Sequence, residues 1–166
     1  MSERKITTSI PDNMSGQKPN ACGPASLAIA LHNLGTPVLP EELEHTMNFN
    51  PDEGVEFHQM IDAARQYGLD VHTTRGVGLK ELKQLKDMGG EVILCWVAGS
   101  NPKEDGHFSV LYDYDEENKL VVLNDTEAGG SIRVYNKRIF ESKWFDLDDE
   151  GEKLPKWAMI ITKPRG

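Results

Sequence analysis

The chain has 166 residues, of which 38% are hydrophobic, and its 18 Lys and Arg against 27 Asp and Glu give a formal net charge of −9. The length suits one domain with a single core, and the composition is globular rather than disordered or fibrous. Because acids outnumber cations, the chain is poorly suited to neutralise a run of phosphates, which argues against a nucleic acid or an anionic membrane as partner.

No segment predicts secretion or a membrane span. No apolar run approaches the roughly 18 residues that a membrane-spanning helix needs, and the N-terminus leads into polar residues rather than the apolar core of a signal peptide. The two cysteines, Cys22 and Cys95, are too few for a disulfide scaffold and fit a reducing compartment. We therefore expect a cytoplasmic protein that is either an enzyme or a binding module.

Residues 22–88 have mostly the pattern of helices. The run that starts at Pro24 is rich in helix formers and stops before Gly35, a residue that suits the position just after a helix. Pro40 opens the next segment, with acids in its first turn. Apolar residues recur at helical spacing in two later segments. Helices are predicted over residues 24–34, from residue 40 onward, over 54–67 and over 79–85.

After residue 90 the hydrophobic pattern changes to that of strands. The continuous apolar run at 92–97 is typical of a buried strand, and the polar turn at 115–118 joins two apolar segments into a hairpin. Asn136 is placed to cap a short helix that runs through Lys143. Strands are predicted over residues 92–97, 107–114, 119–123, 131–135 and 157–162.

Helices first and an antiparallel sheet second predict the α+β fold class. We expect one domain over residues 1–166, with a helical lobe at 1–90 and a sheet lobe at 91–166. The junction between the two lobes is the expected place for a cleft, so the residues with chemical potential are sought there.

The candidate nucleophile lies in residues 17–27, which have the sequence Gln-Lys-Pro-Asn-Ala-Cys-Gly-Pro-Ala-Ser-Leu. Cys22 stands where an irregular loop enters the first helix, so its sulfur is expected near unpaired N–H groups and the positive end of the helix dipole. This setting favours the thiolate, the nucleophilic form. Gly23 gives room for a close approach to the helix start. The amide of Gln17, together with the backbone N–H of Cys22, can donate to an oxyanion.

A thiolate nucleophile needs a general base, and His107 is the candidate. It opens a strand directly after a polar loop, where an imidazole can face a cleft. The base in turn needs an orienting acceptor. Asp125 ends the next strand, and pairing across the short turn brings it to the same end of the ribbon as His107. Cys22, His107 and Asp125 thus follow the triad logic of acyl transfer.

This combination resembles papain-like cysteine peptidases, most closely the bacteriocin-processing branch that cleaves after double-glycine leader peptides, and its stand-alone relatives. The resemblance covers nearly the whole chain, including the order of helical lobe and sheet lobe. It implies a papain-like two-lobe fold with Cys22 as nucleophile, His107 as base, Asp125 as orienting acid and Gln17 as oxyanion donor. The matching segments are residue 17 with residues 21–27, residues 106–111 and residues 123–125.

The chain departs from that branch at two positions. Ala21 stands where Asp usually precedes the cysteine, and Thr126 stands where Pro usually follows the acid. Papain-type enzymes often use Asn as the third member of the triad, so Asn124 stays open as an alternative to Asp125. Strand alternation favours Asp125, because it shares its parity with Leu123.

The expected substrate is a peptide or protein, and Asn20 and Gly106, which lie beside the nucleophile and the base, are the predicted substrate-binding residues. No metal, nucleotide or flavin cofactor is implied, and the oligomeric state stays open. Two other functions also stay open: an acyltransferase or transglutaminase-like enzyme, and a non-catalytic peptide-binding module of the same fold. Cys95, inside an apolar run, is expected to be an inert core residue.

Overall fold

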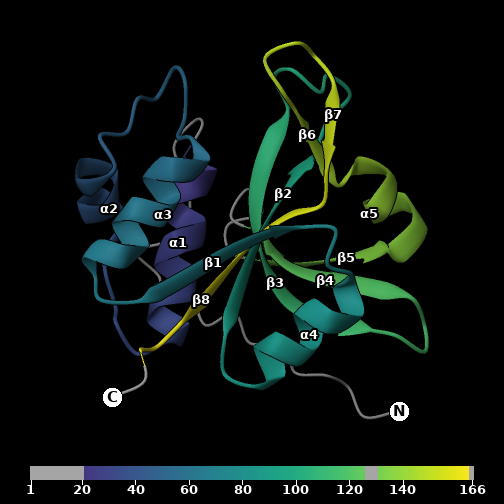
Figure 1. Ribbon diagram of the computed structural model, residues 1–166, viewed down its shortest axis with the longest axis horizontal. Helices are drawn as coiled ribbons and strands as arrows, with labels where there is room; N and C mark the ends of the chain where they lie inside the picture. The colour runs from purple at the N-terminus through teal and green to yellow at the C-terminus, as the bar shows by residue number, and fades with distance from the viewer. Residues whose placement is uncertain (1–20, 126–130, 165–166) are drawn as a thin grey trace.

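The computed structural model describes residues 21–125 and 131–164, which form a six-stranded antiparallel sheet with helices on both faces (Figure 1). The strand order in this sheet is β1-β8-β2-β3-β4-β5, and a separate two-stranded ribbon pairs β6 with β7. The helices are α1 (Cys22–Asn33), α2 (Pro40–Thr46), α3 (Phe57–Gln66), α4 (Leu79–Asp87) and α5 (Lys137–Lys143). The strands are β1 (Asp70–Arg75), β2 (Glu91–Val97), β3 (Gly106–Asp115), β4 (Leu120–Asp125), β5 (Ser131–Asn136), β6 (Phe145–Leu147), β7 (Lys153–Pro155) and β8 (Trp157–Thr162).

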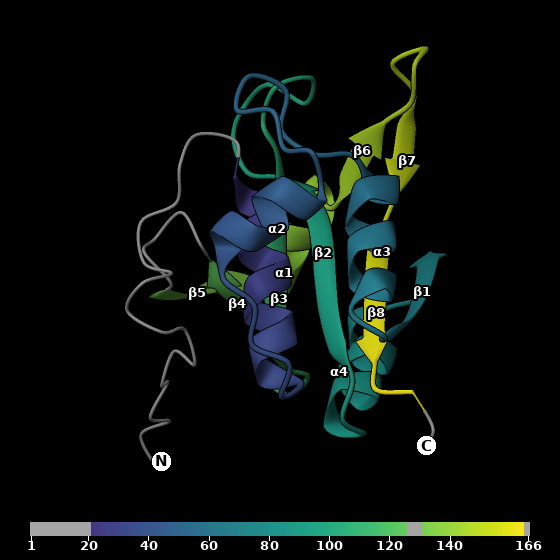
Figure 2. The same ribbon diagram turned by 90° about the vertical axis from the view of Figure 1, so that its left-hand side faces the viewer.

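The sheet is buried on both faces by two separate apolar cores. Helices α1, α2 and α3 gather on one side, where Leu27 and Leu31 of α1 pack with Ile93 of β2 (Figure 2). Leu82 of α4 and Phe140 of α5 belong to the second core, on the other face. Because β2 contributes alternate residues to both cores, its whole length is buried, which accounts for its continuous apolar run.

Most predicted elements are confirmed, with bounds shifted by a few residues. Helix α1 ends at Asn33, and Gly35 follows it with a φ of 83°, a left-handed conformation that glycine adopts without steric cost. The side chain of Asn136 accepts a hydrogen bond from the backbone N–H of Arg138 at 2.9 Å and caps α5 as expected. The predicted α+β class is therefore correct.

The sequence patterns missed three strands. Strand β1 is mostly exposed and polar, and it forms one edge of the sheet by pairing with β8. It comes from within the segment 1–90 that was expected to be helical. Strands β6 and β7 have three residues each, too few to show an alternation. Asp146 lies half-buried in β6 and is ion-paired to Arg75 of β1.

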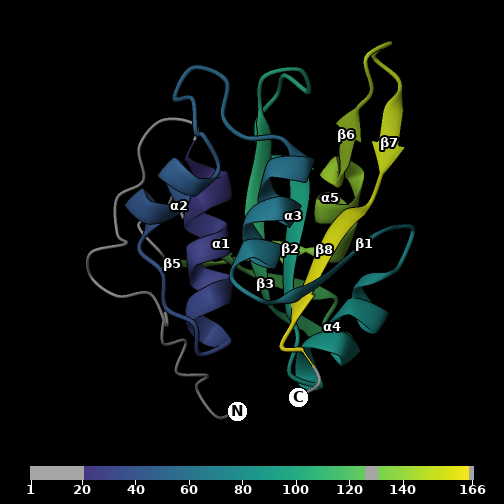
Figure 3. The same cartoon turned by 60° about the vertical axis from the view of Figure 1, so that its left-hand side comes forward.

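Three connections meet at one end of the molecule. Figure 3 shows the α2–α3 loop, the β2–β3 loop and the tip of the β6–β7 hairpin at the top, above the N-terminal end of α1. Among the described residues, none of the helices has the length and apolar character that crossing a membrane requires.

Candidate active site

Cys22 is the first residue of α1, at the end of the helix that faces the three connections. It is half-buried and packs against the core between the helices and the sheet. The next residue, Gly23, sits where a Cβ atom would overlap Cγ2 of Val55 and lie 3.1 Å from Sδ of Met60. The close approach predicted for Gly23 is therefore present, and it brings the start of α1 against the loop before α3.

His107 is the second residue of β3, and only 3% of it is exposed. It lies directly across from Trp96 of β2, and the two rings meet edge to face with their centroids 5.8 Å apart. The indole N–H of Trp96 also donates to Oγ of Ser109 at 3.0 Å. His107 is thus held on the sheet face that carries Trp96, where neighbouring side chains limit its rotation.

Cys22 and His107 line the same cavity, which has a volume of about 290 Å³. The two residues are 85 positions apart in the chain, and the packing of α1 on β3 brings them together. The remaining lining residues belong to the β2–β3 loop and its flanks: Ala98, Gly99, Glu104, Asp105 and Gly106. The predicted nucleophile, the predicted base and the predicted substrate-binding Gly106 therefore share one site.

The other predicted site residues are only partly described. Gln17 and Asn20 lie outside the described residues. Asp125 is the last residue of β4, and its side chain is outside the description as well. Asn124 pairs with Val110 of β3, so the backbone of Asp125 follows one position closer to His107.

Asn124 lies on the sheet face away from Trp96. Its cross-strand partner Val110 belongs to the core under α1, whereas its neighbour Leu123 belongs to the core that contains Trp96. Asn124 is 1% exposed, and its Oδ1 atom has no hydrogen-bond partner among the described residues.

Cys95 is buried in β2, with 6% of its surface exposed, and it belongs to the core under α1. Burial raises the pKa of the Cys95 thiol far above its ordinary value, because the charged thiolate loses its hydration. The expectation that Cys95 is an inert core residue fits this environment.

A larger groove of about 870 Å³ adjoins the Cys22–His107 cavity, and Gly106 lines both. We call it the hairpin groove, because one of its walls is the β6–β7 hairpin. Its lining residues are Val55, Glu56, Phe57, His58, Cys95, Pro102, Lys103, Gly106, Phe108, Asp146, Leu147, Asp148, Asp149, Glu150 and Gly151. Sequence reasoning missed this groove, since the short strands β6 and β7 left no periodic signal.

Within the described part of the chain, no group of three or more His, Cys, Asp or Glu side chains is arranged to hold a metal ion. The Cys22–His107 cavity itself presents a thiol and an imidazole.

A family model matches most of the chain. The model, described as the Peptidase C39 like family, matches residues 8–151. The chain belongs to this family. The matched segment contains Cys22, His107 and every strand except β7 and β8. No curated protein matches the chain.

Solved structures of C39 peptidases share the fold of this family member. The peptidase domain of Streptococcus ComA, a bifunctional ABC transporter involved in quorum sensing, superposes with a TM-score of 0.67 at 20% identity, covering 87% of this chain and 93% of that one. A double-glycine motif protease from an AMS/PCAT transporter, solved with its leader peptide, gives 0.65 at 21% identity, covering 90% and 89%.

A third structure is named as a C39-like peptidase from Bacillus anthracis and gives a TM-score of 0.64 at 17% identity, covering 89% of this chain and 90% of that one. These likenesses confirm the papain-like fold of helices and an antiparallel sheet. Family membership supports a papain-like cysteine peptidase as the general class of this protein.

Proposed function

We propose that the protein is a cysteine peptidase that hydrolyses a peptide bond in the cavity between α1 and β3. The observation that carries this proposal is that Cys22 and His107 line the same cavity. Cys22 stands at a helix N-terminus, where backbone N–H groups and the helix dipole favour negative charge. A thiolate beside an imidazole is the arrangement that nucleophilic catalysis of acyl transfer requires.

The reaction has two halves. In the first, His107 takes the proton of the Cys22 thiol, and the sulfur attacks the carbonyl carbon. His107 then gives that proton to the leaving amine as the C–N bond breaks, leaving a thioester on Cys22. In the second, His107 takes a proton from water as the hydroxide attacks the thioester. The C–S bond breaks, the acid product leaves, and His107 returns the proton to the sulfur of Cys22. The backbone N–H of Cys22 and the amide of Gln17 stabilise the oxyanion in both halves.

Asp125 is the proposed orienting group for His107, in preference to Asn124. His107 contacts Trp96, and Asn124 stands on the opposite face of the sheet with Val110. Alternation along β4 gives the position after Asn124 the parity of Leu123, which packs in the core that contains Trp96. This supports a carboxylate at position 125 as the acceptor that fixes the imidazole.

A peptide is the proposed substrate class. The AMS/PCAT double-glycine motif protease of the same fold is solved in complex with a leader peptide. In this chain the Cys22–His107 cavity opens beside the larger hairpin groove through Gly106, so a segment of chain next to the scissile bond has a surface to occupy.

The decisive experiment is incubation of the full chain with a random-sequence peptide library and mass spectrometry of the products. We expect cleaved peptides from the wild type and none from Cys22→Ala or His107→Ala. The matched control is His72→Ala, which removes an exposed histidine of β1 that lines neither the Cys22–His107 cavity nor the hairpin groove. Cleavage by Cys22→Ala at the wild-type rate would overturn the proposal.

The same measurement with an added primary amine addresses the acceptor of the acyl group. Peptide–amine adducts in place of free acids would make the protein an acyltransferase, because the thioester intermediate is common to both reactions. Peptides that are retained but never altered would indicate a binding module of the same fold.

A further inference from the structure

The hairpin groove has an apolar floor that is rigidly packed. Val55, Phe57 and Phe108 line it, and Phe108 follows His107 directly in β3. The Phe57 ring stacks on Trp157 with centroids 4.2 Å apart and meets Phe108 edge to face at 5.8 Å. An apolar side chain that enters the groove therefore finds a preformed surface close to the reacting groups.

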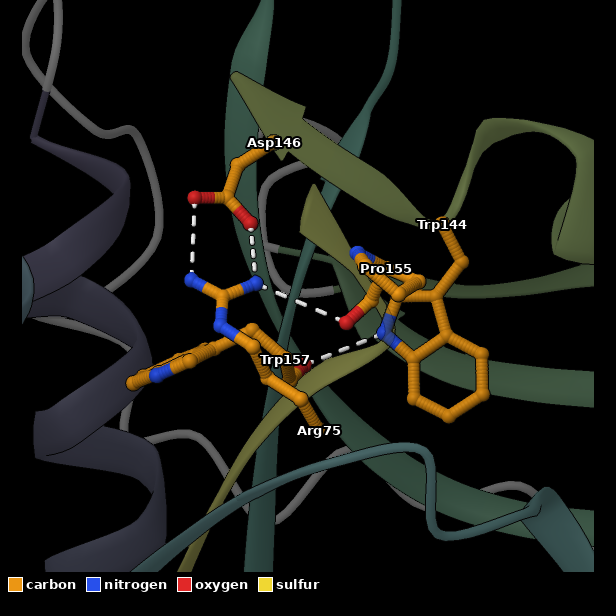
Figure 4. Close-up of polar contacts among 5 residues, drawn as sticks. All are labelled: Arg75, Trp144, Asp146, Pro155 and Trp157. Atoms are coloured by element: carbon orange, nitrogen blue, oxygen red, sulfur yellow. Dashed lines mark hydrogen bonds and ion pairs between the residues drawn. The ribbon is translucent and has the colours of Figure 1, made fainter. Parts of the chain in front are cut away.

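The wall formed by the β6–β7 hairpin is held in place by an ion pair. Nη1 of Arg75 donates to Oδ1 of Asp146 at 2.6 Å, and Nη2 donates to Oδ2 at 3.1 Å (Figure 4). The Arg75 guanidinium also lies 5.7 Å from the centre of the Phe57 ring. At the base of the hairpin, the indole N–H of Trp144 donates to the carbonyl of Trp157 at 3.0 Å.

The rim of the groove carries an excess of negative charge. Asp146 is neutralised by Arg75, but among the described lining residues there are four further acids and a single lysine, Lys103. The acids are Glu56, Asp148, Asp149 and Glu150. Asp148 is fixed, because its Oδ1 accepts the backbone N–H groups of Glu150 and Glu152 at 2.9 and 2.8 Å.

We propose that the hairpin groove binds a segment of the peptide substrate that carries an apolar side chain next to a basic one. The apolar side chain rests on the floor of Val55, Phe57 and Phe108, and the basic one lies against the acids of the β6–β7 wall. This inference rests on the proposed function for its link to catalysis, but it is a statement about binding. A concave low-dielectric site lined by one sign of charge focuses its field on a ligand of opposite charge.

The test separates binding from cleavage by using the full chain with Cys22→Ala. The immobilised protein is incubated with a random-sequence peptide library at low salt, and the retained peptides are sequenced by mass spectrometry. We expect Lys or Arg beside a large apolar residue to be enriched about fivefold over Asp or Glu at the same place. High salt should reduce the enrichment, because exposed charges are screened.

A charge-matched pair of variants assigns the effect to the groove. Asp149→Asn with Glu150→Gln removes two acids from the hairpin wall and should abolish most of the enrichment. Glu41→Gln with Glu117→Gln removes two exposed acids from α2 and the β3–β4 turn, outside the groove lining, and should leave it intact.

Equal loss in both double variants, or no basic preference in the parent, would overturn the inference. If the basic peptides bind Cys22→Ala but the wild type cleaves none of them or any other library member, the proposed function fails and the inference about the groove stands.

Discussion

The Oγ atom of Ser26, on α1, donates a hydrogen bond of 3.1 Å to the backbone carbonyl of Phe108, on β3. Ser26 lies one turn after Cys22, and Phe108 directly follows His107. The bond is buried, so water does not compete for its donor or its acceptor. It ties the helix that carries the proposed nucleophile to the strand that carries the proposed base, and it fixes the distance between them.

Ser26→Ala should therefore affect both stability and turnover. Loss of a buried hydrogen bond leaves the Phe108 carbonyl without this donor, and we expect the free energy of unfolding in urea to fall by about 1–2 kcal/mol. The rate of peptide cleavage should fall by a larger factor than the folded fraction of the protein does. Ser142→Ala is the control, since Ser142 makes an exposed bond within α5. Equal effects of the two variants would contradict the role of Ser26.

Gly23→Ala should be destabilising although alanine is the better helix former. The added Cβ would overlap Val55 and crowd Met60, so either α1 or the loop before α3 must move. Overpacking of this kind costs about 1–3 kcal/mol, measured as a shift in the urea unfolding midpoint. At Gly106 a Cβ meets no atom within 4 Å, so Gly106→Ala should unfold at the wild-type midpoint. A wild-type midpoint for Gly23→Ala would show that α1 does not pack this tightly.

Iodoacetamide should modify Cys22 and spare Cys95 in the folded protein. Cys22 is half-buried at its cavity. Cys95 borders the hairpin groove but is buried, and burial raises the pKa of its thiol and keeps it protonated. As pH rises above about 8.5, an ordinary thiol ionises and reacts faster, but folded Cys95 stays a thiol. Mass spectrometry of peptides from labelled protein measures both sites. Cys95 should react only in urea, and labelling of folded Cys95 at the rate of Cys22 would show that β2 is not buried as described.

The same difference in the pKa of Cys95 between folded and unfolded states links stability to pH. Below the unfolded pKa of about 8.5, both states hold the proton and this stabilising contribution is complete. Above it the unfolded chain releases a proton that the folded chain keeps, so the free energy of unfolding falls as pH rises. Cys95→Ala should make that decline shallower in urea unfolding measured on either side of this pH.

Asp125→Ala should lower kcat by about 10²–10⁴-fold and change the pH profile of cleavage, because the imidazole of His107 loses its orienting acceptor. Asn124→Ala should instead lower stability, since Asn124 is fully buried on the sheet face under α1 and its truncation leaves a cavity there. The kcat of the folded fraction should stay close to wild type. The reverse result, with kcat and the pH profile altered only in Asn124→Ala, would make Asn124 the third member of the triad.

Local sequence patterns were sufficient for the elements that carry the proposed chemistry. Cys22 at the start of a helix, the buried strand β2 and the β3–β4 hairpin each follow from apolar periodicity and turn residues within a few positions. The pairing of Cys22 with His107 could be anticipated, because each residue type matches the needs of the other. Gln17 and the side chain of Asp125 lie outside the described residues, so their roles stay predictions.

The composition and order of residues determined the α+β class and the family resemblance. They also placed Cys22 at the start of a helix and Cys95 inside a buried strand. Tertiary structure alone decided that β1 leaves the helical segment to form an edge of the sheet, and that Arg75 holds Asp146 and with it the β6–β7 wall of the hairpin groove. The physical reason is the range of the interactions. A three-residue strand or a polar edge strand has little periodic signal of its own, and it becomes stable only when a distant segment supplies its hydrogen-bond partners and its counter-charge.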